Sequence, residues 1–292
     1  MAKDKIPTYS ICNLLGSKNC GTDFLITRIA DFVRENRCIH FPHRHTFYQI
    51  VLFTQGSGRH NIDFQDYEVV PHQIYYMAPN QIHTWDFSAD TDGYLINFDE
   101  NFFNSFLQNS QLLKKLPLFH QIVGRPTQIL EANCCIEIVV LFQKLLEEYE
   151  KEASFKQEIL RSILLEILIR LSRTQHQSLK EGVTKHHYTV LQNFEELIEK
   201  HFLEKRLPKE YAELLFVTPN HLNSLCNATV GKSAGELIRE RILLEAKRLL
   251  VNSDHNISEI AYQLNFEDNA YFSRFFKKYL SVSPDEFRKN IL

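Results

Sequence analysis

The hydrophobic pattern of the chain changes character near residue 100. Before that point, apolar residues form short runs separated by turn residues such as Gly, Pro, Asn and Asp. This pattern predicts seven β-strands, over residues 24–29, 48–53, 60–64, 67–70, 74–77, 84–87 and 94–98. Many short strands at regular spacing are typical of a barrel or jelly roll.

After residue 100 the apolar residues recur every three or four positions, which is the period of an amphipathic helix. The period predicts a short helix over residues 101–109 and two long helices over residues 132–151 and 155–173. The short turn at Ala153 and Ser154 favours antiparallel packing of the two long helices. Because both have wide apolar faces, one part can cover the barrel while the surplus binds a second copy of the chain. A purely intramolecular cover is the alternative.

The segment from residue 174 to 185 is polar, contains a glycine and lacks an apolar period, which is typical of a linker. A length of 292 residues also fits two domains, so we predict domains over residues 1–175 and 186–292. The second domain should be helical, with helices over residues 188–202, 209–215, 220–229 and 234–251. Thr218 and Pro219 are suited to the N-cap and first position of the third of these.

The segment from residue 257 to 288 predicts a helix-turn-helix. Its first helix carries an apolar face, and its second carries an apolar face built mainly from aromatic residues. Asn265 and Phe266 interrupt the pattern, and Asn tolerates the left-handed backbone of such a turn. Residues 209–229 form a first unit of the same kind. An ordinary helical hairpin is the alternative, since this geometry is common in proteins that never touch DNA.

The helix predicted between the two units has a mechanical role in this interpretation. It covers residues 234–251, about 27 Å at roughly 1.5 Å per residue. A rigid connector of that length can hold two recognition helices in successive major grooves, which lie about 34 Å apart.

The run IAYQLNFEDNAYFSRFFKKYLSVSPDEFR resembles the signature of the AraC/XylS family of transcription regulators. The residues that carry the resemblance are Ile260-Ala261, Phe266, Tyr271-Phe272-Ser273-Arg274, Phe276-Lys277-Lys278, Ser283-Pro284 and Phe287-Arg288. The family usually has glycine where this chain has Asn265 and Ser281. The first unit resembles the family through Ala212, Val217-Thr218-Pro219, Leu222, Gly231-Lys232-Ser233, Arg241, Ala246-Lys247 and Leu249-Leu250. It departs at Cys226, where the family usually has Phe.

The resemblance implies a two-domain α+β protein that regulates transcription. Its N-terminal domain would be a cupin-like β-barrel with a helical dimerisation pair, and its C-terminal domain all-α, with two helix-turn-helix units joined by a long helix. By position on the recognition helices, base contacts are expected from Asn220, Asn223, Ser224, Asn269, Ser273 and Arg274. Phosphate contacts are expected from Lys232, Lys277 and Lys278. The net charge of the second domain does not support DNA binding, because residues 186–292 contain 14 Lys and Arg against 15 Asp and Glu. DNA-binding domains are more often basic.

The strand region carries a second resemblance, to the two motifs of the cupin superfamily. His43, His45 and His83 fall on the histidine positions of metal-binding cupins, whereas Gln49 replaces the glutamate. The second motif is one residue shorter than Pro-x-Gly-x-x-His. Three imidazoles can hold a divalent metal with open positions, but a neutral amide substitutes poorly for a carboxylate. We therefore expect an organic effector and no metal or cofactor. A metal-dependent cupin enzyme, an isomerase or oxygenase fused to a DNA-binding domain, is the alternative.

The expected effector site consists of His43, His45, Tyr48, Gln49, Tyr75, His83 and Trp85, with Tyr94, Arg28, Arg44 and Arg59 near them in sequence. Aromatic planes with a few convergent polar groups suit a sugar or a small organic acid. The alternative is that about half of these aromatic residues are ordinary strand residues, which strand propensity favours.

Composition limits the remaining possibilities. Apolar residues make up 44% and charged residues 24%, as in ordinary soluble proteins. No apolar run is long enough to span a bilayer and no signal peptide is visible, so we expect a cytoplasmic protein with no membrane partner. The six cysteines show neither CxxC spacing nor a disulfide framework, which suits a reducing compartment and excludes the zinc cluster of AraC-like repair methyltransferases.

The expected activity is therefore regulation, without enzymatic turnover. The expected partners are double-stranded DNA, a small organic effector, a second copy of the chain and RNA polymerase. The choice between activation and repression stays open.

Overall fold

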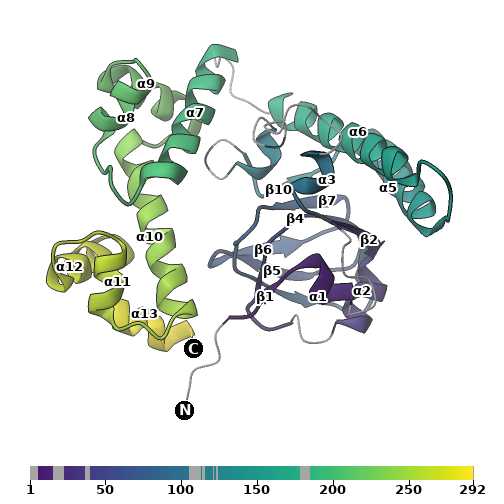
Figure 1. The fold of residues 1–292 in the computed structure, drawn as a ribbon, viewed down its shortest axis with the longest axis horizontal. Coiled ribbons are helices and arrows are strands. Elements are labelled where there is room, and N and C mark those ends of the chain that lie inside the picture. The colour runs from purple at the N-terminus through teal and green to yellow at the C-terminus, as the bar shows by residue number, and fades with distance from the viewer. Residues whose placement is uncertain are drawn as a thin grey trace. The chain divides into compact units, whose positions relative to one another are not determined.

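The computed structural model describes residues 6–15, 23–36, 40–104, 113, 116–120, 122, 124–177 and 185–291. The chain forms two compact units (Figure 1). One spans Pro7–Ser178 and is rich in β-strands, and the other contains Leu179–Leu292 and is helical. The predicted α+β class with two domains is confirmed.

The N-terminal unit contains two antiparallel sheets and one short parallel pair. The five-stranded sheet has the order β10 (Thr127–Ile129), β7 (Gln73–Met77), β4 (Tyr48–Gln55), β9 (Asp92–Phe98), β2 (Phe24–Arg28). The three-stranded sheet has the order β6 (Gln65–Val69), β5 (Gly58–Ile62), β8 (His83–Phe87), and β1 (Thr8–Tyr9) pairs with β3 (Arg44–His45). All seven predicted strands are present, and their ends lie within two residues of the predicted ones.

The five-stranded sheet is buried on both faces, which explains its nearly continuous apolar strands. On β4, Val51 and Phe53 belong to a core that the sheet shares with the three-stranded sheet. Ile50 and Leu52, which point the other way, belong to a core shared with the helices of this unit. Strand alternation therefore decides whether a side chain faces the barrel interior or the helical layer.

Two long helices cover the outer face of this sheet. They are α5 (Ala132–Glu150) and α6 (Lys156–Gln177). Arg170 late in α6 forms an ion pair at 2.9 Å with Glu137 early in α5, so the helices run antiparallel as predicted. However, α6 continues four residues beyond its predicted end, because Gln175 is buried and its Nε2 donates to the Arg125 carbonyl at 3.2 Å. Residues 174–177 are therefore helix rather than linker, and residues 178–184 lie outside the described residues.

Other elements of this unit are short. The predicted helix over residues 101–109 is present as α3 (Asn101–Asn104), and the rest of that range lies outside the described residues. The helices α1 (Ile11–Leu15) and α2 (Ile29–Glu35) and the 3₁₀ turn at Pro117–Phe119 were not predicted. Cys12 is disulfide-bonded, contrary to the expected absence of disulfides, whereas Cys134, Cys135 and Cys226 are free thiols.

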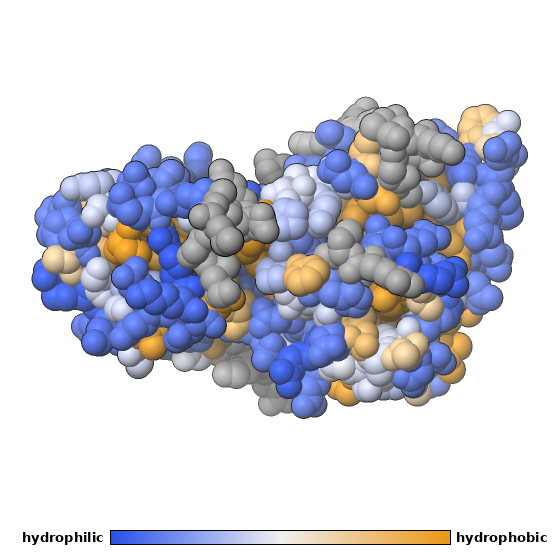
Figure 2. All heavy atoms as spheres, turned by 90° about the horizontal axis from the view of Figure 1, so that it is seen from below, coloured by the Kyte–Doolittle hydropathy of each residue, from blue (hydrophilic) through white to orange (hydrophobic). Residues whose placement is uncertain are grey.

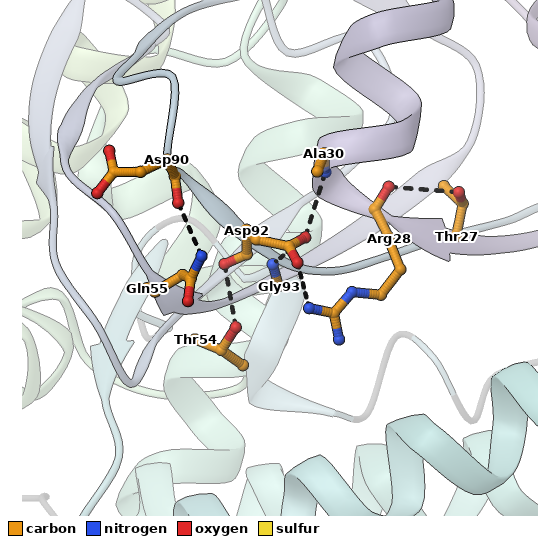
Figure 3. Close-up of polar contacts among 8 residues, drawn as sticks. All are labelled: Thr27, Arg28, Ala30, Thr54, Gln55, Asp90, Asp92 and Gly93. Carbon is orange, nitrogen blue, oxygen red and sulfur yellow. Dashed lines mark hydrogen bonds and ion pairs between the residues drawn. The ribbon is translucent and has the colours of Figure 1, made fainter.

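The junction between β2 and α2 is fixed by Asp92 (Figure 3). Its carboxylate pairs with the guanidinium of Arg28 and accepts the backbone N–H groups of Ala30 and Gly93, at 3.2 and 2.7 Å. Partial burial disfavours the charged carboxylate, but these hydrogen bonds outweigh it and hold the pKa of Asp92 below its usual value. Arg28 is thus a structural residue that also covers the ring of Tyr94, at 4.5 Å from the centroid.

The C-terminal unit consists of seven described helices. They are α7 (Lys185–His201), α8 (Pro208–Leu214), α9 (Pro219–Val230), α10 (Ala234–Asn252), α11 (Ile257–Gln263), α12 (Asn269–Leu280) and α13 (Pro284–Ile291). The predicted helices are confirmed, including the long connector α10, and α13 is additional. On the face that Figure 2 shows, hydrophilic residues prevail and apolar ones occur in small separate groups.

The pairs α8–α9 and α11–α12 have the same turn geometry. The turn residues Phe216 and Asn265 both have left-handed backbones, with φ of 56° and 57°. The N–H of the next residue then bonds the carbonyl of Ala212 in the first unit and of Ala261 in the second, at 3.0 and 2.9 Å. The two predicted helix-turn-helix units are therefore structural repeats.

The repeat extends through the recognition helices and past their ends. Gly231 caps the C-terminal end of α9 and Ser281 that of α12, and both have left-handed backbones, with φ of 76° and 63°. Each is followed by a capping box, Ser233 with Glu236 and Ser283 with Glu286. Each position of α9 thus corresponds to the position fifty residues later in α12.

Candidate effector site and nucleic-acid interface

Six polar side chains meet inside the barrel, all nearly inaccessible to solvent. They are His43, His45, Gln49, His60, His83 and Asn97. His83 on β8 lies at the centre, because the ring centroids of the other three histidines are 4.1, 4.9 and 5.5 Å from its own. Gln49 on β4 and Asn97 on β9 are register partners on neighbouring strands, so their side chains point to the same side.

Hydrogen bonds fix the proton positions of three histidines, and in His43 the Nδ1 atom donates to the Phe41 carbonyl at 2.9 Å. The Nδ1 atom of His45 lies 2.7 Å from the Phe47 carbonyl oxygen, which can only accept, so Nδ1 carries the proton. His60 receives the indole N–H of Trp85 on Nε2 at 2.8 Å, so its proton also lies on Nδ1. This leaves the Nε2 atom of His45 as an acceptor and the Nδ1–H of His60 as a donor. Both are buried without a partner among the described residues.

The amides and the central histidine add further open positions. The Gln49 Nε2 atom donates to Asn97 Oδ1 at 2.8 Å. Among the described residues, no partner is present for Gln49 Oε1, Asn97 Nδ2 or either ring nitrogen of His83. A buried polar atom without a hydrogen bond costs about 1–3 kcal/mol. Several in one cluster therefore indicate a place where another molecule supplies the missing bonds.

The cluster is electrically neutral. It contains no Asp, Glu, Lys or Arg among the described buried residues around it. Burial lowers the pKa of His43, and burial with repulsion from His43 lowers the pKa of His45 to about 3. Burial, with weaker repulsion from neighbouring imidazoles, places the pKa of His60 and His83 well below the ordinary value. All four imidazoles are therefore uncharged at neutral pH.

The structure brings six of the seven predicted effector residues into the barrel interior. Trp85 and Tyr75 line it, although the Tyr75 hydroxyl donates to the Glu68 carbonyl at 2.7 Å. Tyr48 does not join them, because strand alternation turns it to the other face of β4, where it stacks on Phe98. His60 and Asn97 were missed, although each alternates with an inward apolar residue on a predicted strand.

The histidine spacing resembles that of metal-binding cupins, but the described side chains are not arranged as metal ligands. Within the described ranges, no three His, Cys, Asp or Glu side chains are arranged so that they could hold a metal ion together.

The recognition helix of the first unit, α9, presents uncharged polar groups. Asn220 and Ser224 are exposed, as predicted for base-contacting residues. Asn223 is half-buried, and its Oδ1 accepts the N–H of Ala234 at 2.9 Å, so it ties α9 to α10. His221 and Asn227 are exposed on α9 but were not predicted.

The recognition helix of the second unit, α12, presents charge. Arg274, Lys277 and Lys278 are exposed, whereas Ser273 is half-buried. Asn269 is exposed, but its amide donates to the Ser258 hydroxyl at 2.8 Å. Lys232, predicted as a phosphate contact after α9, forms an ion pair with Glu240 at 2.7 Å.

Two family models match the chain over most of both units. An AraC-like ligand binding domain matches residues 31–169, and a helix-turn-helix domain matches residues 211–290. The chain belongs to the AraC family of transcriptional regulators. The N-terminal unit of this AraC-family regulator is thus a ligand-binding domain, and its C-terminal unit is a helix-turn-helix DNA-binding domain.

Curated relatives agree along nearly the whole AraC-family chain. It is 24% identical over 269 residues to the HTH-type transcriptional activator RhaS of Salmonella schwarzengrund, covering 85% of this chain and 88% of the relative. It is 24% identical over 258 residues to the HTH-type transcriptional activator RhaR of Yersinia pseudotuberculosis serotype O:1b, covering 86% and 85%.

Similar solved structures include ToxT from Vibrio cholerae O395 bound to (E)-4-(8-methylnaphthalen-1-yl)but-3-enoic acid. That match has 15% identity, covers 93% of this chain and 100% of ToxT, and has a TM-score of 0.44. The C-terminal domain of AraT from Geobacillus stearothermophilus is 28% identical over 38% of this chain and 88% of that domain, with a TM-score of 0.33. In the described part of the regulator, no helix is long and apolar enough to cross a membrane.

Proposed function

We propose that the effector of this regulator is an uncharged molecule rich in hydroxyl groups, such as a sugar, bound by the polar cluster inside the barrel. The proposal rests on the mixture of unpartnered donors and acceptors on His45, His60, His83, Gln49 and Asn97. A hydroxyl group both donates and accepts, so several hydroxyls can satisfy such a mixture. A carboxylate would bring a charge into an interior without a cationic partner, which is costly. This favours a sugar over an organic acid.

The remaining roles follow the two domains. Residues 1–175 would bind the effector, with His43, Tyr75 and Trp85 completing the walls of the site. Residues 186–292 would bind operator DNA through α9 and α12. The protein would act as a homodimer through α5 and α6, and would influence transcription by contact with RNA polymerase. It would work in the cytoplasm, where the DNA is, and would have no enzymatic activity.

Titration calorimetry on the full chain tests the effector class most directly with matched pairs of ligands. Each pair consists of a neutral sugar and the uronic acid derived from it, because the two share the same ring and differ mainly by one carboxylate. We expect a neutral sugar to bind and its acid to bind at least ten times more weakly, a difference of about 1.4 kcal/mol. Tighter binding of the acids across the panel would contradict the proposal.

Two variants locate the site. Gln49→Leu removes an acceptor of the cluster and should abolish or strongly weaken binding. Tyr48→Phe changes the neighbouring residue on the opposite face of the same strand and should leave binding unchanged. Binding-site selection from a random DNA pool, with and without the bound sugar, then tests whether the effector alters DNA recognition.

A further inference from the structure

The two recognition helices differ in charge at equivalent positions. Because α9 and α12 are structural repeats, Ser224 corresponds to Arg274, Asn227 to Lys277 and Ala228 to Lys278. All six residues are exposed. The second helix therefore carries three cations on a surface where the first carries none, and α9 as a whole contains neither lysine nor arginine.

The charge on α12 is available to a partner. Among the described residues, no carboxylate lies within ion-pair distance of Arg274, Lys277 or Lys278. Lys277 is close enough to Glu286 to contribute to the lowered pKa of that carboxyl, behind the hydrogen bonds from Ser283. Lys278 lies over the ring of Tyr279, at 5.4 Å from the centroid.

In the described part of the first unit, the cation that directly follows the recognition helix is already paired. Lys232 follows α9 directly after Gly231, but its ammonium is paired with Glu240. The polar side chains that α9 exposes carry no fixed charge, and they include Asn220, Ser224 and Asn227. The side-chain nitrogen of Asn227 donates to the Asn223 backbone carbonyl at 3.0 Å, and its side-chain oxygen remains an acceptor on an exposed residue.

We propose that the two units divide DNA recognition between them: α12 supplies the positive charge, with Lys277 and Lys278 on phosphates and Arg274 on guanine, whereas α9 discriminates bases through uncharged side chains alone. This rests on the proposed function, in which both units bind one operator. Lysine and arginine release counterions from DNA and set the salt dependence of binding, whereas uncharged side chains do not. Asn can bond adenine in a bidentate way and Arg can do so with guanine.

The division has consequences for the operator and for the order of binding. The half-site under α9 should be specified by adenine, read by Asn220, and the half-site under α12 by guanine, read by Arg274. Because α9 has little electrostatic attraction for DNA, it should engage only after α12 has docked. The net charge of −1 over residues 186–292 fits weak attraction to DNA of random sequence.

Salt dependence separates the two roles. The affinity of the full chain for its selected operator would be measured by fluorescence anisotropy between about 50 and 200 mM salt. Lys277→Gln combined with Lys278→Gln should reduce the slope of log K against log salt by about two. Asn220→Ala should weaken specific binding roughly 5- to 150-fold and relax the preference for adenine, while the slope stays unchanged.

The reciprocal variant transfers the charge of α12 to the equivalent positions of α9. Ser224→Arg, Asn227→Lys and Ala228→Lys together should steepen the slope and raise the affinity for random DNA. An unchanged slope in the double lysine variant, or a reduced slope in Asn220→Ala, would overturn the division of roles. Failure of the wild-type chain to select any DNA would instead contradict the proposed function. Circular dichroism is used to check that each variant is folded before its DNA affinity is measured.

Discussion

At the scale of single residues, the two recognition helices are capped at equivalent positions by different residues. Gly231 and Ser281 occupy equivalent left-handed positions, yet only glycine adopts this backbone without a steric cost. We expect Ser281→Gly to raise the free energy of unfolding of the helical domain by about 1 kcal/mol. Thermal unfolding followed by far-ultraviolet circular dichroism measures the change.

The matched substitution runs in the opposite direction. A Cβ atom at Gly231 would meet nothing within 4 Å, so Gly231→Ser introduces backbone strain without a collision. It should destabilise the domain by about the same amount. If both substitutions change the free energy of unfolding in the same direction, the strain of the left-handed backbone does not determine the stability difference.

The four buried histidines should make the barrel sensitive to mild acid. Their pKa values are lowered in the folded state, so below the unfolded value of about 6.5 the unfolded chain binds more protons than the folded one. The stability of the barrel is therefore complete above about pH 6.5 and falls as the pH drops towards the folded pKa. Each histidine whose folded pKa lies well below this window contributes a loss of about 1.4 kcal/mol per pH unit as the pH falls.

The single tryptophan of the chain makes this prediction measurable, because Trp85 lies inside the barrel against His60. Urea unfolding followed by its fluorescence at pH 7 and at pH 5 should show a much lower midpoint at pH 5. His60→Gln removes one of the four groups and should reduce the pH dependence. An equal midpoint at both pH values would show that these imidazoles are not held neutral.

At the scale of elements, one arginine joins the two helix-turn-helix units. Arg206 precedes α8, and its guanidinium donates to the carbonyls of Leu264 and Asn265, at 2.6 and 2.7 Å, in the turn after α11. It also lies 4.0 Å from the centroid of the Phe266 ring. Arg206→Lys cannot reproduce this planar set of contacts, so we expect the helical domain to lose about 1–3 kcal/mol of stability.

Chemical unfolding of the full chain, followed by circular dichroism, measures this loss. Lys209→Ala serves as the control, because Lys209 is exposed on α8, close to Arg206 in sequence, and should change stability by less than about 0.5 kcal/mol. A loss in Arg206→Lys no larger than that of the control would mean that the two units are held together by their apolar contacts alone.

Elements were easier to predict than the orientation of their side chains. The strands of the barrel and the helices of both units follow from periodicity, and Asn265 in the turn was readable because Asn tolerates a left-handed backbone. The orientation of Tyr48 depends on which face of β4 packs against the helices. Because both faces of that strand are apolar, the sequence pattern does not distinguish them. The role of Asn223 depends on its contact with Ala234, eleven residues later. The hydrophobic period of a helix gives no information about such a contact with the next helix.

The extension of α6 was missed because its last turn is polar. A polar stretch such as residues 174–177 is typical of a linker until the burial of Gln175 against the loop at Arg125 is known. His60 and Asn97 show the opposite case. Their alternation with Ile62 and Leu95 places them inside the barrel, but a polar residue on a strand is usually taken to face the solvent.

At the scale of the whole molecule, the helical cover of the barrel leaves apolar side chains exposed. The described part of α5 contributes Ile136 and Val140, one turn apart and 64% and 43% exposed. Apolar residues on one helical face that remain exposed in their own chain suit an interface with a second copy. Because a C2 dimer uses the same surface twice, two substitutions on α5 change the interface on both subunits.

The predicted homodimer can be tested with the full chain at micromolar concentration by sedimentation velocity. Wild-type protein should sediment with twice the monomer mass, and Ile136→Glu combined with Val140→Glu should sediment as a monomer, because four buried carboxylates would face one another across the interface. Ile129→Glu is the control, since Ile129 is as exposed as Ile136 but lies on β10.

The monomeric variant should also bind a two-half-site operator roughly 10²–10⁴-fold more weakly, because the second subunit is no longer tethered beside its half-site. A wild-type monomer would contradict the homodimer. A double variant that remains dimeric with full operator affinity would show that α5 does not form the interface.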